Sequence, residues 1–133
     1  MDATAARLTA HRRTAAALTK DTILPAFATL HDEFHRPAQH RYVTIRSGTP
    51  TSADLTISTA PPEAGEPPGA AAGLRYGLAI ALDAKTIAVK RTVNGTTRSF
   101  LGQWFVSSLT QQAIIDDVRR LWRRIALADA ARR

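Results

Sequence analysis

Two histidines spaced four residues apart are the feature of this sequence most suggestive of chemistry. His31 and His35 belong to the stretch HDEFHRPAQH, which also holds two carboxylates and a third histidine, His40. Residues four apart lie on one side of a helix, as in the H-E-x-x-H helices that bind zinc and use the adjacent glutamate as a general base. The spacing therefore raises the hypothesis of a metal site formed by His31, His35 and His40.

Three features of the same stretch argue against that metal site. The residue after His31 is Asp32, so the glutamate stands one position later than the zinc-peptidase pattern needs. Pro37 ends the helix, so His40 lies beyond it. A pair of histidines holds a metal only when a further ligand is already in place. We therefore favour the polar end of an ordinary helix and predict no metal or other cofactor.

Catalytic motifs of other kinds are missing from the sequence. It contains no G-x-S-x-G elbow, no phosphate-binding loop and no G-x-G-x-x-G turn. Cysteine is absent, which excludes disulfides and thiolate chemistry. We therefore expect a binding protein that is not an enzyme.

The composition is that of one globular domain with an excess of positive charge. The chain has 133 residues, 44% of them hydrophobic, and a formal net charge of +7. Its start lacks the apolar region of a secretory signal, and no apolar run approaches the roughly 18–20 residues that span a bilayer. We expect a cytoplasmic protein that does not bind membranes.

Two helical segments would flank the rest of the fold. Residues 1–36 predict a long helix, kinked or broken by Pro25, with an apolar stripe formed by Ile23, Phe27, Leu30 and Phe34. Residues 108–128 predict a second helix, capped by Ser108 or Thr110 and followed by a tail at 129–133. Its apolar face comprises Ile114, Ile115, Val118, Leu121, Trp122 and Ile125, while Asp116 and Asp117 fall with the arginines on the opposite, solvated face.

Between these helices, residues 41–106 predict five antiparallel strands. Alternating side chains mark strands near 41–47, 53–59, 74–82, 85–93 and 96–106, and residues 60–73 form a flexible Pro/Gly-rich loop. Asn94-Gly95 predicts a type I′ hairpin turn that pairs Val93 with Thr96 and Arg91 with Arg98. We predict a single α+β domain in which both helices cover one face of an antiparallel meander.

The face of the sheet turned away from the helices is the leading candidate for binding. Its centre is made of the small residues Gly77, Ala79 and Ala81, and Arg46, Arg75 and Lys90 surround them. Glycine and alanine are poor strand formers, so a row of them is typical of a surface that another molecule approaches closely. The first hypothesis is a protein partner or a second copy of the chain, as in a homodimer; a merely solvated face is the alternative.

Nucleic acid is the second hypothesis. Arginine binds phosphates well, and sequence-independent contacts would come from the basic residues of the sheet and of the last helix. These are Arg46, Arg75, Lys90, Arg91, Arg98, Arg119, Arg120, Arg123 and Arg124. Asp116 and Asp117 would partly neutralise the arginines of the helix, so a solvated helix face is the simpler interpretation there. Phosphate binding would weaken strongly with salt, whereas apolar self-association would barely change.

Overall fold

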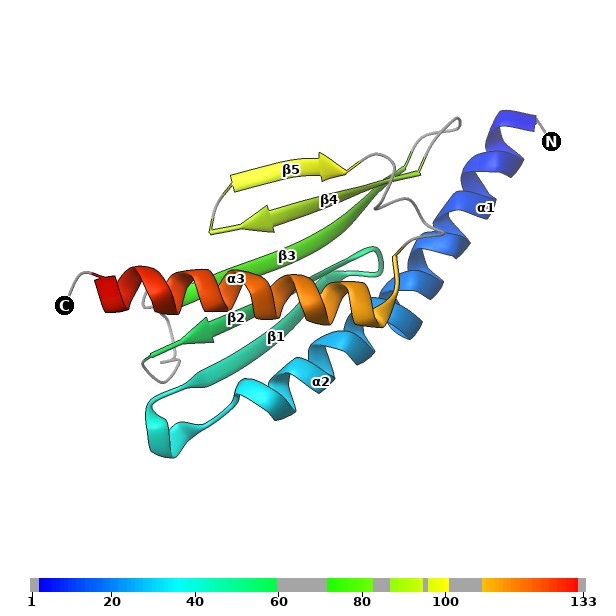
Figure 1. Ribbon diagram of the computed structural model, residues 1–133. Helices are drawn as coiled ribbons and strands as arrows, with labels where there is room; N and C mark the ends of the chain where they lie inside the picture. The colour runs from blue at the N-terminus through cyan, green and yellow to red at the C-terminus, as the bar shows by residue number, and fades with distance from the viewer. Residues whose placement is uncertain (1–2, 60–71, 83–86, 95, 101–108, 132–133) are drawn as a thin grey trace.

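The N-terminal helix is one long rod that contains a wider turn in its middle. The computed structural model describes residues 3–59, 72–82, 87–94, 96–100 and 109–131 (Figure 1). Helix α1 (Ala3–Leu18) continues through a π-helical turn, η1 (Thr19–Ile23), into α2 (Leu24–Phe34). The predicted long N-terminal helix is confirmed, and its irregularity lies directly before Pro25.

Pro25 explains why the turn is wider there. Proline has no N–H to donate, and its ring clashes with the carbonyl four residues earlier, which belongs to Asp21. The chain widens so that the Leu24 N–H donates to the Thr19 carbonyl, five residues back instead of four. Pro25 cannot donate a hydrogen bond to the Asp21 carbonyl. This carbonyl accepts a hydrogen bond of 3.2 Å from the Gln111 side chain of the last helix instead.

The strands follow one another as an antiparallel meander. Its body consists of β1 (Tyr42–Thr49), β2 (Ser52–Ser58), β3 (Ala72–Leu82) and β4 (Ile87–Val93), and the short β5 (Thr96–Phe100) pairs with β4. The predicted antiparallel arrangement is confirmed. The predicted turn at 83–84, most of the 60–73 loop and the stretch 101–106 of the last strand lie outside the described residues.

The hairpin between β4 and β5 has the predicted register. Val93 pairs with Thr96, and Arg91 pairs with Arg98. Asn94 has a φ of 48°, the left-handed conformation that the first position of a type I′ turn requires. Its side-chain oxygen accepts the N–H of Arg75 at 2.8 Å and its own N–H donates to the Arg75 carbonyl at 3.0 Å, so the turn also holds β3.

Helix α2 and the last helix, α3 (Gln111–Ala131), pack on the same face of the sheet. Tyr76 of β3 shows this directly, because its ring contacts Phe27 of α2 edge to face at 6.1 Å and its hydroxyl reaches Asp117 of α3. Figure 1 shows α3 crossing the sheet and α2 running beside β1. The predicted apolar positions are buried, among them Ile23, Phe27, Leu30, Phe34, Leu55, Ile57, Tyr76, Leu78, Ile80, Val89, Ile114 and Val118.

The ends of the two packed helices follow from their sequences. Thr110 caps α3, since its hydroxyl oxygen accepts the Ala113 N–H at 3.1 Å; the other predicted cap, Ser108, lies outside the described residues. Trp122 packs edge to face on Phe34 with 5.9 Å between ring centroids, as its place in the apolar pattern predicts. Helix α2 ends at Phe34, and His35 is already extended (φ −72°, ψ 106°) ahead of Pro37.

Asp117 is buried, so the prediction that it lies on the solvated face of the last helix is wrong. It is 4% exposed. Its carboxylate accepts hydrogen bonds from the Tyr76 hydroxyl at 2.8 Å, from Arg91 at 2.6 and 2.7 Å, and from Arg120 at 2.6 Å. Burial raises the pKa of the Tyr76 hydroxyl, and the negative charge of Asp117 raises it further. Position 117 faces the sheet because Arg91 of β4 supplies the counter-charge there.

Replacing Asp117 by leucine should therefore cost more than a surface substitution does. The change removes the carboxylate that pairs with Arg91, whose side chain is 15% exposed, and that accepts the hydrogen bond of the buried Tyr76 hydroxyl. We expect the free energy of unfolding to fall by about 3–5 kcal/mol, as measured by urea denaturation. The double variant Arg91→Met/Asp117→Leu removes both charges and should recover most of that loss; a double variant as unstable as the single one would contradict this assignment.

Candidate functional site

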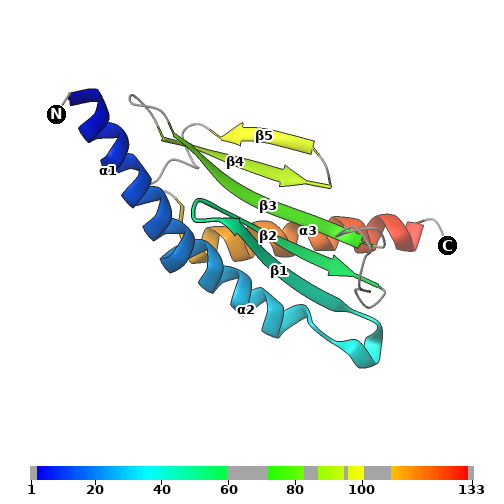
Figure 2. The same ribbon diagram turned by 180° about the vertical axis from the view of Figure 1, so that it is seen from behind.

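The sheet surface turned away from α2 and α3, called the outer face below, holds half of the predicted binding residues. Figure 2 views the molecule from that side, with α3 behind the strands. The strand register arranges the outer face in rows, Thr44–Thr56–Arg75, Arg46–Asp54–Gly77–Thr92 and Ser52–Ala79–Lys90, with Ala81 beside Ala88 beyond them. Short side chains dominate these rows, and the long ones are basic.

The cations of the outer face are exposed and pair with no carboxylate that the structure describes. Arg46, Arg75 and Lys90 are all exposed, and none of them forms an ion pair within the described part of the chain. Ala79 between them is exposed too, whereas Ala81 is partly buried. The outer face therefore presents exposed positive charges around a centre of small side chains.

Asp54 is a further residue of the outer face, and it is not among the binding residues predicted from the sequence. It stands directly opposite Arg46 on one side and Gly77 on the other. A Cβ atom added to Gly77 would collide with the Asp54 carboxylate, so that carboxylate lies over the glycine. Gly77 is accordingly buried. The glycine makes room for a carboxylate of the neighbouring strand, and Asp54 is the group that an approaching molecule meets at this position.

The other predicted binding residues do not lie on the outer face. Arg91 points to the core side, where it binds Asp117, and Arg98 holds the backbone position opposite it on β5, with its side chain outside the described parts. Arg119 and Arg120 also contact carboxylates, while Arg123 and Arg124 are exposed on α3. Because α3 covers the core side, its arginines and the outer face cannot contact one flat surface together.

Arg119 joins the two packed helices. Its Nε donates to both carboxylate oxygens of Glu33 on α2 at 3.1 and 3.0 Å, and its Nη1 lies 3.9 Å from Asp116. The hydrogen bond to Glu33, together with the negative charges of Glu33 and Asp116, raises the pKa of the Arg119 guanidinium, opposed by partial desolvation. Arg119 is thus bound to carboxylates of the protein itself. Arg123 and Arg124 are the described arginines of α3 that are exposed and form no ion pair with a described residue.

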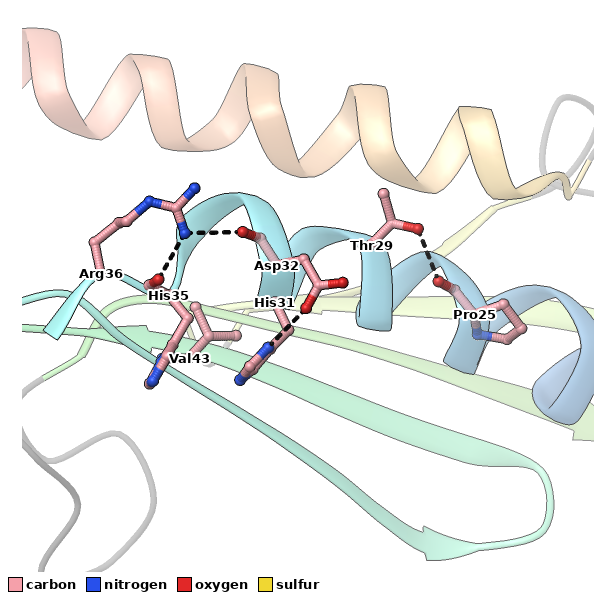
Figure 3. A network of polar contacts seen from close by, with 7 residues as sticks. All are labelled: Pro25, Thr29, His31, Asp32, His35, Arg36 and Val43. Carbon is pink, nitrogen blue, oxygen red and sulfur yellow. Dashed lines mark hydrogen bonds and ion pairs between the residues drawn. The ribbon is translucent and has the colours of Figure 1, made fainter.

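The histidine pair connects the end of α2 to the first strand. Figure 3 shows His31 beside Asp32, with 3.4 Å between the imidazole Nδ1 and a carboxylate oxygen, and His35 beside Val43. The two imidazole rings stack at 4.6 Å between centroids, and His35 Nδ1 accepts the Val43 N–H at 3.1 Å. That hydrogen bond requires Nδ1 to be unprotonated, so a neutral His35 carries its proton on Nε2.

The third histidine, His40, does not complete a metal site with His31 and His35. His40 has a left-handed φ of 55° at the end of the short helix η2 (Pro37–Gln39). No group of three histidine or carboxylate side chains that could hold a metal ion occurs among the residues the structure describes. His35 Nδ1 is already used by the Val43 N–H. The chemistry of the pair is that of a hydrogen-bonded joint between α2 and β1.

Comparison with protein-family models, with curated proteins and with solved structures finds no match for this chain. No helix within the described ranges is long and apolar enough to cross a membrane. The function must therefore be inferred from the geometry and charge of the described surfaces.

The fit between Asp54 and Gly77 can be tested with a pair of variants. Gly77→Ala should lower the free energy of unfolding by about 1 kcal/mol or less, because the new methyl group displaces only the exposed end of the Asp54 side chain. In an Asp54→Ala background the same substitution should cost much less. Chemical denaturation of the four proteins gives both numbers, and an equal cost in the two backgrounds would rule out the proposed fit.

The role of His35 can be tested at a single amide. His35→Ala leaves the Val43 N–H without its acceptor, so we expect faster hydrogen exchange at Val43 and a stability loss of about 1–3 kcal/mol. Gln39→Ala is the control at a nearby exposed position, with an expected loss of no more than about 0.5 kcal/mol. Unchanged exchange at Val43 in the His35 variant would show that the ring does not protect this amide.

Proposed function

We propose that the protein is a non-enzymatic binding module that engages an acidic protein partner through its outer face. The observation that carries this proposal is the charge of that face. Arg46, Arg75 and Lys90 are exposed and unpaired by any described carboxylate. Ala79 in their midst allows close approach. Complementary charge across an interface speeds association and excludes partners of the wrong sign.

Asp54 favours a protein partner over a nucleic-acid backbone at this face. A phosphate backbone is uniformly negative and would meet the Asp54 carboxylate between the strands that carry Arg46 and Arg75. A protein surface can place a basic group or a hydrogen-bond donor at that one position and carboxylates around it. Arg91, Arg119 and Arg120, which the nucleic-acid hypothesis also needs, are bound to carboxylates on the other side of the sheet.

The same charges disfavour a second copy of the chain as the occupant. A two-fold interface brings the same patch of both copies together. The basic patch of one copy, with Arg46, Arg75 and Lys90, would then lie against the same basic patch of the other. Like charges brought together across an interface cost about 2 kcal/mol or more. We therefore assign the outer face to a different protein. A dimer seen by sedimentation equilibrium that Ala79→Glu dissociates would contradict this.

Photo-crosslinking from Ala79 is the direct test of the partner. A crosslinking amino acid at Ala79 should capture one protein in cells that express the chain, and the same amino acid at Thr29, exposed on α2, should not. The captured protein, once purified, should bind with a Kd raised about tenfold or more by Ala79→Glu, a loss of about 1.4 kcal/mol. Thr29→Glu, which adds the same charge elsewhere, should leave the Kd unchanged.

Two results would overturn the proposal. The first is capture of the same proteins from Ala79 and Thr29, because the outer face would then have no special role. The second is a purified partner whose binding is insensitive to Ala79→Glu and to Lys90→Glu, because the contact would then lie elsewhere.

A further inference from the structure

Helix α1 carries a second concentration of unpaired positive charge, which the proposed function does not use. Residues 3–20 contain Arg7, Arg12, Arg13 and Lys20 and neither aspartate nor glutamate. All four cations are exposed. None of them forms an ion pair with a residue that the structure describes. On α3, by contrast, Arg119 and Arg120 are matched by nearby carboxylates.

The helix is also held by very little of the domain. Ala15 is the buried residue of α1, and residues 3–7 are all exposed. Figures 1 and 2 show α1 running past the strands, with the N-terminus at its far end. Alanine has the highest intrinsic helix propensity, so its abundance here keeps this segment helical without a packing partner. An exposed helix of this kind presents most of its circumference to other molecules.

The outward side chains of α1 are short apart from its cations. Thr9 and Thr14 turn their hydroxyls back to the carbonyls of Ala5 and Ala10, at 2.9 and 3.0 Å. What remains on the surface of the exposed half is mostly methyl groups and arginine side chains. The helix is therefore thin, and bulky residues do not prevent it from entering a narrow groove.

The positions of the arginines around α1 point to the shape of its ligand. At about 100° per residue, Arg7, Arg12 and Arg13 point to three sides of the helix, about 100–140° apart. A membrane surface would need an apolar stripe, and the two leucines of α1 are half-buried against the domain. A flat acidic protein would reach one of the three sides. Negative charge on several sides at once is found in a groove with phosphates along both walls.

We infer that α1 is a groove-entering helix that binds double-stranded DNA through its phosphates. The major groove of B-form DNA is about 12 Å wide and admits an α-helix, whereas the deep, narrow major groove of duplex RNA does not. The contacts proposed for these arginines are to phosphates, which carry no sequence information, so we expect binding that is independent of sequence. This site is separate from the outer face, and either assignment can fail without the other.

Fluorescence anisotropy with a labelled DNA duplex of mixed sequence tests the inference on the full chain. If Arg7, Arg12 and Arg13 each neutralise one phosphate, affinity should fall about 40-fold between 50 and 200 mM salt. In Arg12→Gln/Arg13→Gln one such contact remains, and the same change in salt should weaken binding only about fourfold. Glutamine has a helix propensity close to that of arginine, so α1 should stay helical.

Arg123→Gln/Arg124→Gln is the matched control. It removes the same charge from exposed positions of α3, whose C-terminal end lies far from α1 in Figure 1, and it should bind DNA as the unaltered protein does. If circular dichroism shows lost helix in the α1 variant, Arg12→Lys/Arg13→Lys, which keeps the charge, takes its place and should retain both binding and the steep salt dependence.

Several outcomes would overturn the inference. No binding to the duplex at 50 mM salt would do so, as would an equal loss of affinity in the α1 variant and in the α3 control. Equal affinity for single-stranded DNA or duplex RNA would remove the groove from the explanation. Competition by poly-glutamate at equal charge would show that α1 recognises acidic polypeptides instead.

Discussion

The buried carboxylate of Asp117 is the interaction on which the arrangement of the last helix and the sheet depends. A charge with 4% exposure is strongly unfavourable unless it is paired and hydrogen-bonded, and Asp117 satisfies this through Tyr76, Arg91 and Arg120. Only one rotation of α3 and one position along its axis place the carboxylate between β3 and β4 in this way. The apolar contacts around it supply most of the stabilising free energy, and the polar cluster selects which of many apolar packings forms. We regard its specificity as the main contribution of this cluster, since a buried ion pair adds little net stability over an apolar pair.

The same strands give the two sides of the sheet opposite electrostatic characters. Successive residues of a strand point to opposite faces, so Arg91 reaches Asp117 on the core side while its neighbour Lys90 is exposed on the outer face. On the core side, Arg91, Arg119 and Arg120 are matched by carboxylates of α2 and α3, whereas the exposed cations of the outer face and of α1 form no ion pair with a residue that the structure describes. The described part of the molecule therefore separates arginines that are neutralised internally and hold it together from exposed cations that can meet other molecules. The two proposals above concern the exposed cations alone.

Much of the fold could be predicted from the sequence because its signals are local. The stripe of Ile23, Phe27, Leu30 and Phe34, the alternation of the strands and the Asn94-Gly95 pair each need only the neighbouring residues to be interpreted. Within the described residues, the structure shows the buried stripe, the left-handed Asn94 and the register of the last hairpin as predicted. Asp117 could not be placed in this way. Helical periodicity shows which residues share a face, but it does not show that Arg91, 26 residues away, lies opposite. The outward position of Asp54 follows from the alternation of β2, in which Leu55 and Ile57 point inward. Its contact with Gly77 depends on the pairing of β2 with β3, so that contact is beyond a local interpretation.

The π-turn at Thr19–Ile23 sets how the charged N-terminal helix faces the rest of the domain. Each residue of an α-helix turns the chain by about 100°, so a turn that holds one residue more than the α-helical number offsets the faces of α1 and α2 by that angle. If the same residues formed a regular α-helix, α1 would be rotated about its own axis by about 100° relative to α2. Ala15 would leave the core, and every arginine of the helix would change its direction, although no side chain of α1 had been altered. The direction of these charges is thus set by the width of one turn, which Pro25 makes necessary.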